Sequence, residues 1–161
     1  MLRPMPAITI RPARKEDSAR LAEFIHGLAD FVGDECVVTP EAIERHLFSE
    51  RPAAEALIAE YDSKPEGFAL FFPTFSTFQG RPSLYLEDFF VNPKMRGKGV
   101  GLAMLVRLAQ ITQERGYCRL DWAVLDWNTR AADFYKRLGA EAIEEFTMYR
   151  LTEEALATLT A

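Results

Sequence analysis

The chain has 161 residues, of which 48% are hydrophobic and 27% charged, and its formal net charge is −5. This length and composition predict one globular domain, spanning residues 1–161, with a single core. The negative charge argues against nonspecific nucleic-acid binding, and the absence of an apolar run of ~20 residues or a secretion signal argues against a membrane protein and for a cytoplasmic one.

Alternation and helical spacing of apolar residues predict the strands and helices in the first half of the chain. The expected elements are a strand 7–12, a helix from 16, a loop 33–35, a helix 40–48, a strand 54–60, a turn 62–66 and a strand 67–75. Thr39, Pro40 and Glu41 form a helix start, with an N-cap, a proline at the first position and an acid in the first turn. Asp34 and Glu35 place two carboxylates in the first loop, which is either a solvated loop or a functional one.

The second half begins with a buried strand, Leu84–Val91, that carries the carboxylate pair Glu87 and Asp88. A proline ends this strand, and a glycine-rich loop leads into a helix that should stop at Gly116. The remaining predicted elements are a strand 119–125 parallel to 84–91, a helix 129–138, two strands 141–145 and 146–151, and a short helix capped by residue 152.

The loop Arg96–Leu102 joins a strand to a helix through three alternate glycines flanked by basic residues. Such a connection presents free backbone N–H groups and the positive end of a helix dipole to an anion, so we expect a phosphate or pyrophosphate here rather than an ordinary turn. The dinucleotide fingerprint fails, because its last glycine falls on Leu102 or Met104. The Walker loop fails as well, since no glycine stands five residues before Gly97.

Cys36 and Cys118 are far apart, and neither belongs to a C-x-x-C motif or a histidine cluster. They predict two unpaired thiols rather than a disulfide or a zinc site. No metal ligand set is expected elsewhere.

Three segments carry a family resemblance. Arg96–Gly101 reads R-x-x-G-x-G and resembles the acetyl-CoA pyrophosphate loop of the GNAT N-acetyltransferase superfamily. Trp127–Ala140 resembles the superfamily segment with an asparagine followed by FY-x-x-x-GA. Leu86–Val91 resembles the signature of the diamine (spermidine/spermine) and thialysine acetyltransferase branch. Beyond Ala140 the likeness weakens, because Glu144–Tyr149 replaces the EEGW that this branch commonly has.

The resemblance implies an α/β (α+β) GNAT fold, with a central mixed, mostly antiparallel sheet, a splayed parallel strand pair and flanking helices. It also implies acetyl-CoA as the acetyl donor and a homodimer. The implied site for acetyl-CoA includes backbone N–H groups that a bulge and the splayed pair leave unpaired. Its residues would be Phe89, Phe90, Val91, Arg96, Gly97, Lys98, Gly99, Val100, Gly101, Leu102, Asn128, Ala131 and Tyr135.

Acetyl transfer from a thioester needs a neutral amine, donors for the thioester oxygen and a proton for the departing thiolate. Tyr135 matches the family's general acid; the alternative is that Phe134 and Tyr135 are only an aromatic core pair. Asn128 resembles a contact to the CoA arm, and a plain helix cap is its rival role. Glu87 would be the charge partner of the amine and, through water, the base.

The resemblance further implies an acceptor site formed by Asp34, Glu35, Glu87, Asp88, Asp121, Trp122 and Ala123. Because adjacent strand residues point to opposite faces, we expect Glu87 rather than Asp88 to face the acceptor. The function implied is N-acetylation of a small cationic amine, a polyamine, diamine or lysine-like amino acid, in a ternary complex. The alternatives are a protein N-terminal or lysine acetyltransferase and an acyl-CoA-binding module without turnover.

Overall fold

The computed structural model describes residues 7–161 and divides the chain into two compact units, Met1–Ala123 and Val124–Ala161. The first unit contains one five-stranded sheet in the order β1-β2-β3-β4-β5. Its strands are β1 (Ile8–Pro12), β2 (Glu55–Tyr61), β3 (Lys64–Ser76), β4 (Arg81–Val91) and β5 (Leu120–Trp122). Neighbouring strands are antiparallel except β4 and β5, which are parallel. The predicted mixed, mostly antiparallel sheet with one parallel pair is therefore confirmed.

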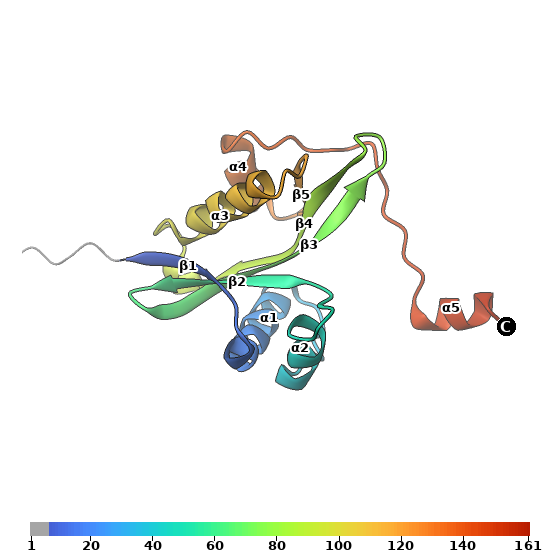
Figure 1. Ribbon diagram of the computed structural model, residues 1–161, viewed down its shortest axis with the longest axis horizontal. Coiled ribbons are helices and arrows are strands. Elements are labelled where there is room, and N and C mark those ends of the chain that lie inside the picture. The colour runs from blue at the N-terminus through green and yellow to red at the C-terminus, as the bar shows by residue number, and fades with distance from the viewer. Residues whose placement is uncertain (1–6) are drawn as a thin grey trace, which may run out of the picture. The chain divides into compact units, whose positions relative to one another are not determined.

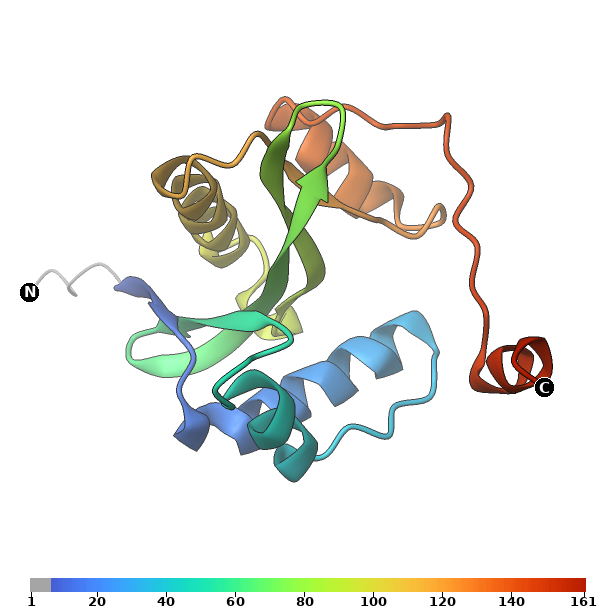
Figure 2. The ribbon, with the colours of Figure 1, turned by 45° about the vertical axis from the view of Figure 1, so that its right-hand side comes forward.

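Helices cover both faces of this sheet (Figures 1 and 2). Helices α1 (Ser18–Val32) and α2 (Pro40–Leu47) lie on one face, and α3 (Val100–Glu114) lies on the other. A short 3-10 turn, η1 (Lys15–Asp17), precedes α1, so the regular helix begins two residues after the predicted start. Thr39 caps α2 as predicted, since its Oγ1 accepts a hydrogen bond from the Ala42 N–H at 3.2 Å.

Apolar side chains of the helices and strands close the core on each face. The face under α1 and α2 buries a cluster in which the Phe24 ring stacks on Phe68, with ring centroids 6.1 Å apart, and Phe90 packs beside both. On the other face, α3 buries the apolar residues that the sequence predicted at helical spacing: Met104, Leu105, Leu108 and Ile111. The Phe89–Val91 segment at the end of β4 is thus held from both sides of the sheet.

Strand β3 is longer at its start than predicted. The connection from β2 is a two-residue turn, Asp62–Ser63, with φ of 50° and 64°, rather than the predicted five-residue turn. Two central residues with positive φ match the right-handed twist of a hairpin, and Lys64 and Pro65 therefore already belong to the strand. Strand β4 likewise begins at Arg81, three residues before the predicted Leu84.

Strand β4 contains a bulge at Glu87. Leu86 pairs with Phe71 and Asp88 pairs with Leu70, so Glu87 has no opposite residue on β3. The pairing of β4 with β5 ends at Leu86, although β4 continues to Val91. The bulge that the family resemblance implied is confirmed. Strand β5 is shorter than the predicted strand 119–125, so β4 has no parallel partner beyond Leu86.

A glycine fixes the approach of β3 to the end of β4. A Cβ at Gly67 would lie 2.6 Å from the carbonyl oxygen of Phe90, so only glycine fits without movement of the backbone. Next to it, Asn92 donates from its side chain and from its backbone to Glu66, at 2.9 and 2.8 Å. These contacts set the direction in which the chain leaves β4 for the glycine-rich loop.

The second unit contains α4 (Thr129–Arg137) and α5 (Glu153–Leu159). Thr152 caps α5 as predicted, accepting from the Ala155 N–H at 3.3 Å. The predicted strands 141–145 and 146–151 are wrong, because this stretch forms no strand in the structure. Its Ile143, Phe146, Thr147 and Tyr149 have high strand propensity, but a strand also needs a partner edge, and propensity does not supply one.

The two cysteines are unpaired, as predicted. Within residues 7–161, no helix is both long enough and apolar enough to span a bilayer.

Candidate active site

The glycine-rich loop has the backbone conformation expected of an anion cradle. Gly97 and Gly99 have φ of 78° and 88°, a left-handed region that disfavours residues with a Cβ. Gly99 is the N-cap of α3, and no side chain caps this helix, so its first N–H groups are left for a ligand. A 15-residue helix also directs the positive end of its dipole at this point. The loop therefore fits a diphosphate.

Both basic side chains of the loop lie on aromatic rings from other elements. The Arg96 Cζ is 4.7 Å from the ring centroid of Phe31, at the end of α1. The Lys98 Nζ is 5.3 Å from the ring centroid of Tyr61, at the end of β2. Cation–π contacts of this kind hold a positive charge near a surface without neutralising it, so both charges remain available to an anion.

Phe89, Phe90 and Val91 adjoin the loop directly. A Cβ at Gly101 would lie 3.6 Å from the Phe89 ring, and the Arg96 Nε donates to the Val91 carbonyl at 3.3 Å. The Phe90 side chain is buried in the core, so only its backbone can serve a ligand. No strand pairs with the β5 side of β4 beyond Leu86 among the described residues, and in an antiparallel strand alternate N–H groups point to that side.

The carboxylates at the bulge differ in their surroundings. Glu87 is exposed, whereas Asp88 is half-buried, and burial together with the nearby Glu87 charge raises the pKa of Asp88 above its usual value. Burial, Glu87 and Asp121 likewise raise the pKa of the Tyr85 phenol. Two acidic groups, Glu87 and Asp121, therefore lie near Tyr85. Simple alternation fails at this point, because an extra residue in the strand resets which side each following side chain faces.

Replacing Asp88 with asparagine should stabilise the protein at neutral pH. Because the native state holds the Asp88 proton more tightly than the unfolded chain, the free energy of unfolding falls as the pH rises from about 3.8 through the native pKa. We expect Asp88→Asn to raise Tm at pH 7 by a few degrees, and to have no effect below pH 3.8.

Thermal unfolding of the ligand-free protein between pH 3 and 8 measures this effect, with Asp30→Asn, at an exposed position of α1, as the control. A lower Tm for Asp88→Asn at pH 7 would show instead that favourable contacts hold the Asp88 carboxylate in the fold.

The predicted acceptor residues on β5 are only partly suited to that role. Asp121 lies opposite Tyr85 in the parallel register, but Arg119 donates to its Oδ2 at 2.7 Å, so its charge is already compensated. Trp122 is half-buried opposite Leu86, and Ala123 is exposed at the end of the first unit.

Asp34 and Glu35 follow the left-handed cap Gly33 at the end of α1. The Asp34 Oδ1 accepts from the Glu35 N–H at 2.9 Å, and both side chains are exposed. The two carboxylates are therefore accessible to a cation.

Asn128, Ala131 and Tyr135 all belong to the second unit and share one face of α4, at helical spacing. The Asn128 Oδ1 accepts from the Ala131 N–H at 3.3 Å, so the capping role is present. The Tyr135 and Phe134 ring centroids are 5.4 Å apart, and the aromatic pair is present as well. Burial raises the pKa of the Tyr135 phenol, which keeps it protonated at neutral pH.

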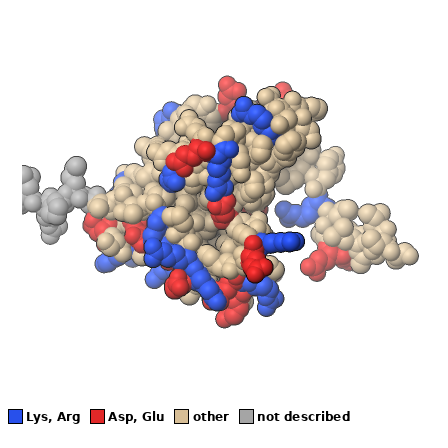
Figure 3. All heavy atoms as spheres, viewed as in Figure 1, with Lys and Arg blue, Asp and Glu red and all other residues tan. Residues whose placement is uncertain are grey.

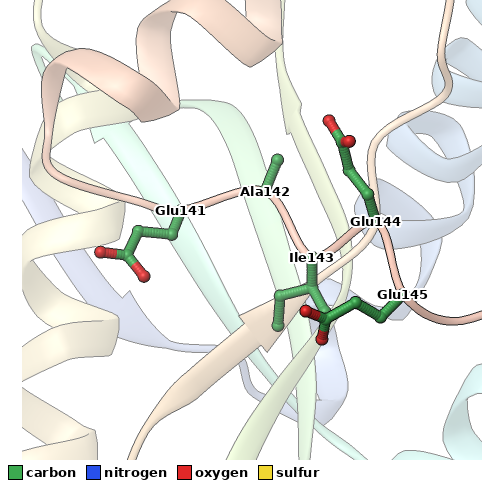
Figure 4. Close-up of a pocket in the computed structure, with 5 residues that line it drawn as sticks. All are labelled: Glu141, Ala142, Ile143, Glu144 and Glu145. Atoms are coloured by element: carbon green, nitrogen blue, oxygen red, sulfur yellow. The ribbon is translucent and has the colours of Figure 1, made fainter.

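A hollow beside 141–145 does not resemble a built site. Consecutive residues of one connecting segment line it, and in Figure 4 the carboxylate of Glu141 points to the left and that of Glu144 points upward, so the two do not converge. In the described part of the chain, no three potential metal ligands lie together. On the face shown in Figure 3, acidic and basic side chains are interspersed and form no uniform basic surface.

Sequence reasoning missed Phe31, Tyr61 and Tyr85 as parts of this site. Phe31 and Tyr61 come from elements far from the loop in sequence, and no local motif links an aromatic residue to a distant cation. Tyr85 shows a weak signal, since it stands two residues before Glu87 on a strand where neighbouring side chains alternate.

Comparison with known proteins identifies the family. The model of the acetyltransferase (GNAT) family matches residues 25–140. Thialysine N-epsilon-acetyltransferase of Bos taurus is 34% identical over 168 aligned positions, which cover 96% of this chain and 98% of the relative. Spermidine/spermine N(1)-acetyltransferase-like protein 1 of Homo sapiens is 30% identical over 94% of this chain and 24% of its own length.

Comparison with solved structures leads to the same family. An integron cassette protein from the mobile metagenome of V. cholerae superposes with a TM-score of 0.80 at 29% identity, covering 95% of this chain and 97% of that one. These findings confirm the resemblance to the diamine and thialysine branch. The chain belongs to the acetyltransferase (GNAT) family, and the protein is an acetyltransferase.

Proposed function

We propose that this protein transfers acetyl from acetyl-CoA to a primary amine of a small cationic acceptor, a polyamine, diamine or lysine-like amino acid. The observation that carries the proposal is the arrangement of β4. Its bulge presents the carboxylates of Glu87 and Asp88, its following residues leave N–H groups along an open edge, and its end leads into the Arg96–Leu102 loop. The name of the bovine relative, a thialysine acetyltransferase, supports this acceptor class.

Acetyl-CoA supplies the reactive thioester, and the residues of the first unit would hold it. The N–H groups of Gly99, Val100, Gly101 and Leu102 would bind the diphosphate, with Arg96 and Lys98 adding positive charge. N–H groups at Phe89–Val91 would receive the pantetheine arm and stabilise the thioester oxygen as it gains negative charge.

The acceptor arrives as an ammonium ion and must lose a proton before it attacks. We propose that Glu87, exposed at the bulge, accepts this proton directly or through water, and that Asp88 helps to hold the cation. The amine nitrogen then forms a bond to the acetyl carbon while the carbon–sulphur bond breaks in the ternary complex. Asp34, Glu35 and the β5 residues 121–123 would bind the remainder of the acceptor.

The departing thiolate needs a proton, and Tyr135 is the proposed donor. A phenol is protonated at neutral pH, and burial raises the pKa of Tyr135 further, so its proton is present when the thiolate leaves. Asn128 and Ala131, on the same face of α4, would contact the CoA arm.

We further propose that the two units form one domain spanning 1–161, and that the protein is a cytoplasmic homodimer. Association of two copies is supported by exposed apolar side chains along the stretch that joins α4 to α5. The most exposed of them are Phe146, Met148 and Tyr149. Sedimentation at micromolar concentration should give the mass of a dimer, and a monomer would contradict this part of the proposal.

An acceptor panel tests the proposed activity. The protein is incubated with acetyl-CoA and with spermidine, putrescine, ornithine, lysine, thialysine or a lysine-containing peptide, and thiol release is followed. We expect turnover with at least one small diamine or amino acid, at a kcat/KM at least tenfold above that for the peptide. A preference for the peptide would indicate a protein acetyltransferase, and CoA binding without any turnover would indicate a binding module.

A further inference from the structure

The ring of Phe31 supports the guanidinium of Arg96. The Arg96 Cζ lies 4.7 Å from the ring centroid, and Phe31 comes from the last turn of α1, far from the loop in sequence. This ring is 42% exposed, which is unusual for a phenylalanine at the end of a core helix. Its contact with a cation gives a reason for that exposure.

The contact leaves the functional edge of Arg96 available. The Nε donates to the Val91 carbonyl at 3.3 Å, and neither Nη group has a hydrogen-bond partner among residues 7–161. When a guanidinium lies against a ring, its N–H donors remain in its own plane and can still bind an anion. Val91 and Phe31 therefore fix the side chain from two sides while its Nη edge stays open.

Phe31, which carries this ring, is connected through the backbone to the acidic loop formed by Asp34 and Glu35. The N–H groups of Gly33 and Asp34 both donate to the Ala29 carbonyl, at 2.8 and 3.1 Å, so the backbone remains bound to the last turn of α1 as far as Asp34. A shift of Phe31 would shift Asp34 and Glu35 with it. Arg96, Phe31 and the acidic loop thus form one connected series of contacts within the first unit.

We propose that Phe31 is a positioning residue that holds Arg96 for the diphosphate of CoA and transmits occupation of that site to the Asp34–Glu35 loop. The proposal rests on the proposed function. A bound diphosphate fixes the guanidinium, the guanidinium fixes the ring, and the ring fixes the last turn of α1. Binding of CoA would in this way order the carboxylates that receive the acceptor.

Calorimetric titration with CoA tests the first half of the proposal. Phe31→Leu keeps the apolar bulk but removes the π face, and we expect a Kd for CoA about three- to tenfold higher than that of the wild type. Phe31→Tyr, which keeps the ring, should bind within twofold of the wild type. Phe78→Leu, at a fully exposed ring in the β3–β4 turn, is the matched control and should not change the Kd.

The same substitution made in an Arg96→Gln protein distinguishes a loss of Arg96 positioning from a general loss of fold stability. In Arg96→Gln the ring has no cation to support, so adding Phe31→Leu should not weaken CoA binding further. Additive losses in the double variant would overturn the positioning role. An unchanged Kd for Phe31→Leu in the wild-type background would overturn it as well.

Amide hydrogen exchange tests the second half. In the wild type, saturating CoA should slow exchange both in 96–102 and in 33–36; in Phe31→Leu at matched saturation it should slow exchange only in 96–102. Equal protection of 33–36 in both proteins, or none in the wild type, would contradict the transmission. Failure of the wild type to bind CoA would instead contradict the proposed function itself.

Discussion

Replacing Gly99 with valine is expected to raise the Kd for CoA at least about 100-fold. Gly99 has a φ of 88°, and a β-branched residue in this region costs on the order of 1–3 kcal/mol. The loop would relieve that strain by turning its N–H groups away from the ligand. The two methyl groups would in addition occupy space at the N-cap of α3, where the diphosphate must approach.

The control for this variant is Gly116→Val. Gly116 also has a positive φ, of 67°, and a Cβ added there would have no neighbour within 4 Å, but it follows the opposite end of α3. Both variants should lose similar thermal stability, and only Gly99→Val should lose CoA binding. A folded Gly99→Val protein that binds CoA within threefold of the wild type would contradict the assignment of the loop.

Replacing Tyr135 with phenylalanine is expected to lower kcat about 100-fold or more, with the Kd for CoA changed by less than twofold. A positioned general acid contributes roughly 10²–10⁴ to a rate, and the substitution removes only the phenolic proton. Because burial raises the pKa of Tyr135, the wild-type kcat should show no loss from this group until the pH exceeds about 10, the ordinary phenol pKa.

Steady-state kinetics with the best acceptor of the panel, together with calorimetry of CoA binding, measure both quantities. Tyr117→Phe, at a half-buried tyrosine in the connection from α3 to β5, is the control and should keep the wild-type kcat. If Tyr135→Phe also keeps it, then the ring serves only as the aromatic partner of Phe134, and another group protonates the thiolate.

The sequence predicted most of the fold because the information is local. Helical spacing located α3, and Thr39 and Thr152 capped the helices that they were expected to cap. The parallel pairing of the strand at residues 120–122 with β4 followed from a strand–helix–strand connection. The glycine-rich loop was recognisable because left-handed backbone and free N–H groups require glycine at defined positions.

Features that depend on a partner segment could not be predicted from local pattern. The bulge at Glu87 is a property of the register between β3 and β4, so only the family resemblance indicated it. That bulge also explains why alternation gave an incomplete account of Glu87 and Asp88. The expected strands at 141–151 failed for a related reason, since strand propensity does not identify a partner edge.

The candidate site likewise combines features that local sequence predicts with features that depend on distant segments. The residues of the Arg96–Leu102 loop are adjacent in sequence, so a common role in binding an anion could be proposed from their spacing alone. The aromatic supports, Phe31 and Tyr61, come from distant elements and appear only when the chain is folded. The compensation of Asp121 by Arg119 is also visible only in three dimensions, although the two residues are close in sequence.

A calorimetric comparison of CoA with pantetheine tests most directly whether the loop at the start of α3 binds the diphosphate of CoA. Pantetheine has the same thiol arm but no diphosphate. We predict a Kd for CoA of about 1–100 μM, a Kd for pantetheine at least about 100-fold higher, and a loss of about tenfold or more for CoA in Arg96→Gln. Equal affinity for the two ligands, or an Arg96→Gln protein that binds CoA as tightly as the wild type, would contradict diphosphate binding at this loop.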